Sequence, residues 1–110
     1  MENYINLKDA ERVFRNGVMG YTLLTEAHGC TNGCCTGVSV FSNTEYPKVS
    51  RHEDQEGFMV LEGTGWARVG EEEIPLEPET SFIVPAGVGH AVKKNPDSKP
   101  IKIFWFHAGI

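Results

Sequence analysis

The chain has 110 residues, 40% of them hydrophobic and 23% charged, which is typical of one folded domain and excludes a disordered or fibrous chain. Ten basic and fifteen acidic residues give a net charge of -5, and no basic cluster exceeds Lys93-Lys94, so we expect no nucleic-acid partner. The longest apolar runs, among them residues 103–106, are far below the roughly 20 residues of a membrane span. Residues 1–4 lack the features of a secretory signal, so we expect a cytoplasmic protein without a membrane partner.

Short strands separated by turns dominate the pattern along the chain. Residues 2–16 mix charges with isolated apolar residues, which predicts an arm or an edge strand within residues 1–17. Later β-forming runs are bounded by turn residues, and they cover residues 20–25, 36–41, 58–61, 66–69, 73–76, 82–84, 90–92 and 101–106. Gly70-Glu71 is expected to turn a hairpin. Eight or nine strands at this spacing, with no sustained helical period, predict an all-β barrel or double sheet.

Three cysteines, Cys30, Cys34 and Cys35, lie within six positions. Their odd number argues against a disulfide framework, and their spacing does not match structural zinc sites, which use two separated ligand pairs. We expect small buried or half-buried thiols at the start of a strand, with a redox or ligand role as the alternative. A thiol enzyme built on Cys34-Cys35 is disfavoured because no neighbouring cation is present to activate a thiol.

His52, Glu56 and His90 are the strongest candidates for chemistry. Glu56 begins a strand in which Phe58 shares its face, so an inward-facing Glu56 would place a carboxylate on an apolar wall. Such a carboxylate needs a partner or a bound cation. His90 follows a turn at residues 85–89, whose two glycines let the backbone bend sharply. Two imidazoles and a carboxylate at one point form a facial triad for a divalent transition metal, although each residue alone could be an ordinary polar group.

Two motifs resemble those of the cupin superfamily. Residues 85–90, Pro-Ala-Gly-Val-Gly-His, are similar to the family's second motif, proline-x-glycine-x-x-histidine. Residues 50–56, followed by Gly63, are similar to the first motif: histidine-x-histidine, three or four residues, glutamate, six residues, glycine. The resemblance covers roughly residues 37–106, the expected barrel core of a single cupin domain that spans residues 1–110. It implies a double-stranded β-helix, or jelly-roll, barrel that commonly forms a homodimer.

The resemblance also implies the metal ligands. The family's second histidine falls on His52, its glutamate on Glu56 and its motif-two histidine on His90, whereas Ser50 replaces its first histidine. Three protein ligands could still hold a divalent metal, Zn, Fe, Mn or Ni, with an extra open position. Alternatively, another side chain replaces the lost imidazole, or the pocket is metal-free and binds a small organic ligand. The candidate replacements are His28, His107 and the three cysteines. Glu79 stands at or near the glycine that usually precedes the second motif.

Further side chains are expected to line a ligand pocket, which in barrels is mostly apolar with few polar groups. If Lys102 points to water, strand alternation turns Trp105 and His107 inward, and the alternative for His107 is a cap on a frayed strand end. The expected pocket residues are Ser50, Phe58, Trp66 and His107.

Two classes of function follow from the resemblance. One is a metal-dependent enzyme acting on a small sugar-like or carboxylate-like ligand. Isomerase, lyase and dioxygenase chemistries all occur on this fold, so the fold does not select among them. The other is a metal-free ligand-binding or sensory protein without catalytic activity, which Ser50 in place of a histidine favours.

Overall fold

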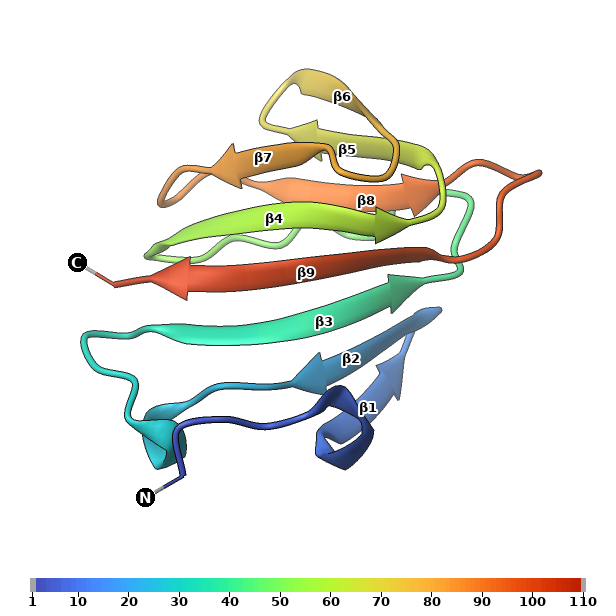
Figure 1. Ribbon diagram of the computed structural model, residues 1–110. Helices are drawn as coiled ribbons and strands as arrows, with labels where there is room; N and C mark the ends of the chain where they lie inside the picture. Colours follow the sequence, from blue (N-terminus) through green and yellow to red (C-terminus); the bar gives the residue numbers. More distant parts are fainter. Residues whose placement is uncertain (1, 110) are drawn as a thin grey trace.

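The computed structural model describes residues 2–109, which form nine strands in two antiparallel sheets (Figure 1). The strands are β1 (Glu11–Arg15), β2 (Val18–Thr22), β3 (Cys35–Phe41), β4 (Gln55–Glu62), β5 (Gly65–Val69), β6 (Glu72–Leu76), β7 (Ser81–Val84), β8 (His90–Lys94) and β9 (Ile101–Ala108). The larger sheet has the order β1-β2-β3-β9-β4-β7, and the smaller has the order β6-β5-β8. This architecture confirms the predicted all-β jelly-roll class.

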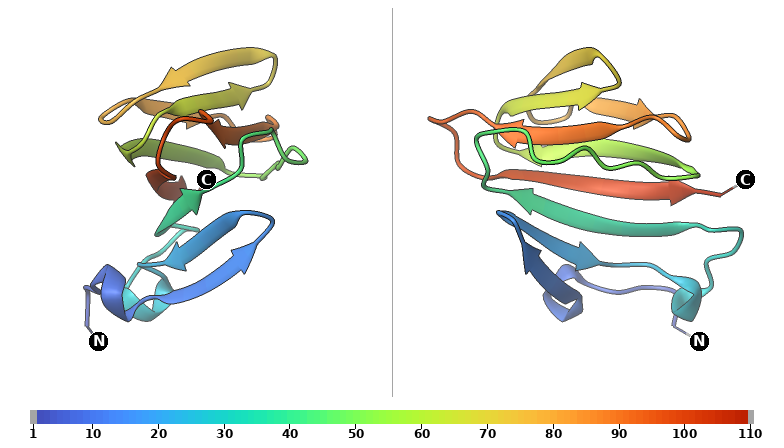
Figure 2. Two further views of the ribbon diagram at one scale, coloured as in Figure 1. Left: turned by 90° about the vertical axis from the view of Figure 1, so that its right-hand side faces the viewer. Right: turned by 180° about the vertical axis from the view of Figure 1, so that it is seen from behind.

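Two 3-10 helices of three residues each, η1 (Leu7–Asp9) and η2 (Glu26–His28), precede β1 and β3. No helix within residues 2–109 has the length and apolar character needed to cross a membrane. β1 is one of the two edge strands of the larger sheet, and Figure 2 shows that the β1–β2 hairpin extends beyond the area covered by the smaller sheet. The predicted hairpin at Gly70-Glu71 is present between β5 and β6.

Strand alternation builds the core between the two sheets. On β4, Phe58 and Val60 are 5% and 1% exposed, whereas the intervening Met59 is 40% exposed. On β9, Ile101 and Ile103 are completely buried. The inner faces of both sheets supply the rest of the core, which comprises Ala67, Leu76, Phe82, Val84 and Val92. Burying the larger of these apolar side chains stabilises each by about 1.5–3 kcal/mol and fixes the inward direction of every second residue on β4 and β9.

β9 lies between β3 and β4 and pairs with both of them. In this register His107 is opposite Cys35 on β3 and opposite Glu56 on β4. The side chains of His107 and Glu56 therefore leave the same face of the larger sheet, toward the interior. The pairing of β4 with β9 thus brings together two polar residues that are 51 positions apart in the chain.

Glu79 adopts the backbone conformation of the glycine that the cupin pattern has near this place. Its φ is 76°, in the left-handed region, and its N–H donates to the carbonyl oxygen of Val60 at 2.8 Å. A residue with a Cβ is disfavoured in this region by about 1–2 kcal/mol. The turn before β7 therefore keeps its shape without the glycine, and the missing glycine does not remove the second half of the barrel.

Candidate metal centre

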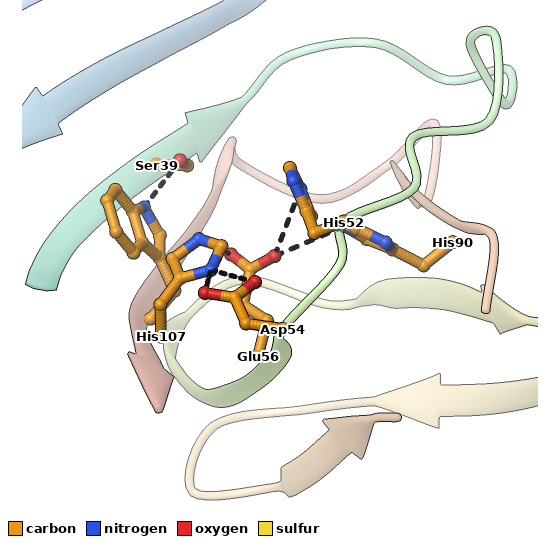
Figure 3. A network of polar contacts seen from close by, with 7 residues as sticks. Ser39, His52, Asp54, Glu56, His90 and His107 are labelled. Carbon is orange, nitrogen blue, oxygen red and sulfur yellow. Dashed lines mark hydrogen bonds and ion pairs between the residues drawn. The ribbon is translucent and has the colours of Figure 1, made fainter. Parts of the chain in front are cut away.

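His52, Glu56 and His90 meet at one point beside the inner face of the larger sheet (Figure 3). His52 lies in the loop before β4, Glu56 is the second residue of β4, and His90 is the first residue of β8. One ligand atom from each lies within 4.8 Å of the other two. Glu56 Oε1 is 3.4 Å from His52 Nε2 and 3.6 Å from His90 Nε2. The structure thus brings the three predicted ligands together.

Backbone hydrogen bonds hold the two histidine-bearing segments side by side. The N–H of Ser50 donates to the carbonyl oxygen of His90 at 3.0 Å, and the N–H of His90 donates back at 2.9 Å. Gly87, at φ 80°, donates its N–H to the carbonyl oxygen of His52 at 2.8 Å. This hydrogen bond holds the turn at residues 85–89 against the loop that carries His52. Ser50 supports the site through its backbone, a role for which its side chain is not needed.

The electrostatics of the site fit a bound cation. Glu56 is only 6% exposed, and burial raises the pKa of its carboxyl to about 7. The pKa of His90 is lowered to about 4, mainly by burial and to a lesser extent by the nearby His52 and His107. Its imidazole is therefore neutral and can act as a ligand. Three buried side-chain atoms of the described residues have no hydrogen-bond partner, and two of them, Glu56 Oε1 and His90 Nδ1, belong to the triad; the third is Asn43 Oδ1. A buried carboxylate oxygen between two imidazole nitrogens is the arrangement that a divalent metal satisfies.

An Asp54–His107 pair supports Glu56 from its other side. Both carboxylate oxygens of Asp54 lie 3.0 Å from His107 Nδ1, and this contact lowers the pKa of Asp54. His107 Nε2 lies 3.5 Å from Glu56 Oε2, whereas the two triad histidines approach Oε1. His107 thus lies between the two carboxylates, hydrogen-bonded to Asp54 through Nδ1 and within ion-pair distance of Glu56 through Nε2. His107 is therefore a positioning residue that orients the carboxylate, and it is not a cap on a frayed strand end.

Sequence reasoning missed Asp54 because it stands in the acidic run Glu53-Asp54-Gln55-Glu56, which resembles a solvated loop. Its spacing was the available signal: an extended backbone turns residues two apart to the same face, and although Asp54 lies in the bend before β4, its side chain and that of Glu56 both face His107. His107 lies on that face through the pairing of β4 with β9. Identifying the contact requires this strand register, which the sequence pattern does not provide.

Removing this support is expected to weaken metal binding without removing a ligand. In an Asp54→Ala variant, metal affinity should fall by about 10–100-fold, the usual effect of losing a residue that orients a metal ligand. Competition titration against a chelator measures the change. Glu53→Ala is the matched control, since it removes an exposed carboxylate from the same loop. Equal affinities for the two variants would show that Asp54 does not act through Glu56.

A cavity of about 300 Å³ lies beside the triad. Its apolar wall includes Phe41, Phe58, Val92 and Trp105, and its polar lining includes Arg15, Asn16, Ser39, Lys48 and Ser50. Trp105 Nε1 donates to Ser39 Oγ at 3.0 Å, which fixes the indole in the wall. Ser50 and Phe58 therefore lie where the pocket was expected. A separate hollow of about 690 Å³ lies on the other side of His52 and is bordered by His107 and Cys35.

Several expected residues lie elsewhere. Trp66 does not line the cavity. Its neighbours on β5, Gly65 and Ala67, are buried and face inward. Strand alternation therefore turns the Trp66 side chain outward, where it is 38% exposed. His28 does not replace the lost histidine, since its Nδ1 accepts a hydrogen bond from the Thr25 N–H at the start of η2. The ring of His28 is therefore committed to a helix cap.

The three cysteines are free thiols and none belongs to the group of converging ligand atoms. Cys30 and Cys35 are half-buried, but Cys34 is exposed, so the expectation of a buried or half-buried thiol was wrong for Cys34. Cys34 lies in the loop before β3, where no second sheet covers it, whereas Cys35 is the first residue of that strand.

Comparison with known proteins agrees with this architecture. The chain resembles the RmlC-like cupin from Shewanella frigidimarina NCIMB 400, with a TM-score of 0.75 and 21% identity over 97% of this chain and 91% of that one. It also resembles the hydroxypropylphosphonic acid epoxidase from S. wedmorenis (TM-score 0.81, 16% identity) and the polyketide cyclase RemF from Streptomyces resistomycificus (TM-score 0.76, 16% identity). Alignment covers 96% of this chain and 58% of the epoxidase, and 97% of this chain and 80% of the cyclase.

These identities establish the fold alone, and the chain spans little more than half the length of the epoxidase. No curated protein matches the chain. A family model described as the cupin domain matches residues 39–107, which is more than half of the chain and includes both motifs and all three converging ligands. The chain therefore belongs to the cupin family.

Proposed function

We propose that this cupin binds a divalent transition metal through His52, Glu56 and His90 and acts on a small organic ligand in the adjacent cavity. The observation that carries the proposal is the buried, unpartnered Oε1 of Glu56, which lies 3.4 and 3.6 Å from two imidazole nitrogens. Such an oxygen is costly to bury unless a cation balances it. Two histidines and one carboxylate also leave coordination positions for a ligand or water.

A metal bound here would act as a Lewis acid on a carbonyl or carboxylate oxygen of the ligand. The chain's own residues prepare the surroundings. Phe58 and Trp105 line the cavity with apolar surface and exclude water from that wall. Ser39 accepts from Trp105 and keeps its own hydroxyl proton for donation to a ligand. These groups would bind and orient a small molecule beside the triad. They are compatible with isomerase, lyase or dioxygenase chemistry, among which the fold does not select.

Metal analysis tests the proposal directly. Protein purified without chelators and then reconstituted with Fe, Mn, Zn or Ni should hold about one equivalent of at least one of these metals. At a free metal concentration about 100 times the Kd, the folded state should gain about 2.7 kcal/mol. A content below about a tenth of an equivalent, with no thermal stabilisation on adding metal, would contradict metal binding.

Ser50 supports a second candidate, a metal-free ligand-binding or sensory cupin, because a hydroxyl is a poor substitute for the family's first histidine. Thermal-shift screening of sugars, sugar acids and amino acids, with and without metal, separates the two functions. If a sugar raises the thermal midpoint by the same amount with and without a chelator, the second candidate is favoured. Stabilisation that requires metal favours the first.

We also propose that the protein is a homodimer, as the family resemblance implies. Met59, Ile83 and Phe106 are 40%, 49% and 39% exposed on the outer face of β4, β7 and β9. Gly57 pairs with both Ile83 and Phe106, so these side chains form one apolar surface next to the edge strand β7. Exposed apolar surfaces of this kind mark contacts with other chains. Light scattering should give twice the mass of the chain, and an Ile83→Glu variant should give the monomer mass.

A further inference from the structure

We propose that the cavity takes a small organic acid, and that Arg15 and Lys48 at its rim bind the carboxylate of that acid. Both residues line the same cavity as His52, Glu56 and His90. The inference rests on the proposed function only for the part of the ligand that faces the triad. The two cations and the polar groups beside them carry the assignment of the acid.

Arg15 reaches the cavity because of the register of the β1–β2 hairpin. It is opposite Val18 on β2, which is opposite Phe41 on β3, so all three side chains leave the inner face of the larger sheet. The turn that follows uses Asn16 and Gly17, both at positive φ, as tight hairpins require. The carbonyl oxygen of Gly17 accepts from the Ser42 N–H at 2.8 Å. The end of β1 is therefore fixed in place, with its arginine turned toward the cavity.

Lys48 lies in a loop that is anchored on both sides. Before it, Asn43 Nδ2 donates to the carbonyl oxygen of Val92 at 2.9 Å, and the Tyr46 hydroxyl donates to Glu73 at 2.7 Å. After it, the two backbone hydrogen bonds between Ser50 and His90 close the loop onto β8. These contacts hold the backbone around Lys48 at the rim of the cavity. The position from which its long side chain extends is therefore fixed.

Neither cation is neutralised by the protein. Within residues 2–109, Arg15 and Lys48 take part in no ion pair, and Glu56 is the only acidic residue among those that line the cavity. Glu56 already belongs to the metal triad, so the rim of the cavity is positive in a chain whose net charge is -5. A rim of this sign raises the local concentration of anions and speeds their association. Its charge therefore selects against neutral and cationic ligands.

The size and lining of the cavity narrow the ligand class further. A volume of about 300 Å³ is at the lower end of the range for small-molecule sites. An arginine binds a carboxylate through two parallel hydrogen bonds, and a lysine adds a point charge. Ser39 adds a hydroxyl to the lining of the same cavity, next to Trp105. The combination fits a small acid with a short carbon skeleton, with its second oxygen function toward the triad.

Matched acid and amide pairs test the proposal. We would titrate metal-loaded and metal-stripped protein with lactate and lactamide, malate and malamide, and benzoate and benzamide, and with inorganic phosphate, by calorimetry at low ionic strength. At least one acid should bind, and its amide should not. Arg15→Gln and Lys48→Gln should each weaken that acid by about 10–100-fold, since a hydrogen bond to a charged group contributes about 1.5–3 kcal/mol. Both variants should keep the metal content of the unaltered protein.

Arg12→Gln is the matched control, because Arg12 lies three positions from Arg15 on β1, is opposite Tyr21, and does not line the cavity. Its affinity for the acid should be unchanged. Binding of none of the acids, equal binding of acid and amide, binding of phosphate alone, or acid binding that survives both substitutions would each overturn the proposal. If the acid binds through Arg15 and Lys48 but no metal is retained, the proposed metal function fails and this inference stands.

Discussion

Glu56→Gln is expected to abolish metal binding and, in the same variant, to make the metal-free protein more stable at pH 8. Glutamine keeps the size of the side chain but loses the charge that a divalent cation requires. The loss in metal affinity should reach at least about 100-fold, the upper end of what losing only an orienting residue causes. Stability should rise because the variant no longer buries an ionised carboxylate, which in the native chain is 6% exposed with an unpartnered Oε1.

The pH dependence of this effect has a definite sign. Burial raises the pKa of Glu56 in the folded state to about 7, from an ordinary value of 4.5. Protonation therefore favours the folded state: this contribution is fully present below pH 4.5 and is lost as the pH rises through 7. Since glutamine does not ionise, the difference between variant and native protein should be near zero at pH 4.5. At pH 8 it should be on the order of 3 kcal/mol.

Urea denaturation of metal-stripped protein at pH 4.5 and pH 8 measures both quantities. Glu53→Gln, at an exposed site in the adjacent loop, should show no difference at either pH. Metal at about 1,000 times the Kd, where binding adds about 4.1 kcal/mol, should reverse the order of stability at pH 8, because only the native protein gains from binding. A Glu56→Gln variant that is less stable than the native protein at pH 8 without metal would contradict the burial argument.

Gly65→Ala is expected to produce a large loss of stability, at the upper end of or beyond the 1–3 kcal/mol typical of overpacking. A Cβ at Gly65 would lie 2.1 Å from the carbonyl oxygen of Lys93 and 2.8 Å from Ile101 Cδ1. The closest atom belongs to the backbone of β8, so a change of side-chain rotamer cannot relieve the contact. Gly65 also pairs with Lys94 and Leu76, which prevents β5 from moving away from either neighbour.

Gly20→Ala provides the comparison for this prediction. Gly20 also lies within a strand, β2, but the nearest atom to its added Cβ would be the Val13 carbonyl oxygen at 3.8 Å, an ordinary contact. Its free energy of unfolding should stay within about 0.5 kcal/mol of the native value, as is usual for substitutions without a steric conflict. Its thermal midpoint should therefore stay close to that of the native protein. Similar midpoints for the two variants would mean that β5 and β8 tolerate separation.

The parts of the fold that follow local patterns were predictable from the sequence. Alternation on β4 and β9 placed Phe58 and Ile103 inward, and the turn at residues 85–89 placed His90 at a strand start. The three ligands could be named because family motifs preserve their spacing. The parts that depend on strand register were not predictable. Asp54 meets His107 across 53 positions, and only the pairing of β4 with β9 decides that contact.

Arg15 and Trp66 illustrate the same limit. Arg15 belongs to a segment whose pattern mixes charges with isolated apolar residues, so only the pairing of β1 with β2 shows which face it takes. Trp66 is aromatic and lies in a strand, which suggested a pocket wall, yet its place between two inward-facing small residues turns it outward. Composition indicates which residue types build a site, whereas the face of each residue depends on pairing between distant segments.

The central position of β9 has a consequence for how the protein is made. Residues 101–108 are synthesised after β1 to β8, yet they fill the space between β3 and β4. Until they emerge, β3 and β4 each present an unpaired row of backbone groups, the kind of edge that recruits other chains. Pairing between such distant segments is also slow. The nascent chain therefore passes through an aggregation-sensitive stage, which ends when β9 pairs with both edges.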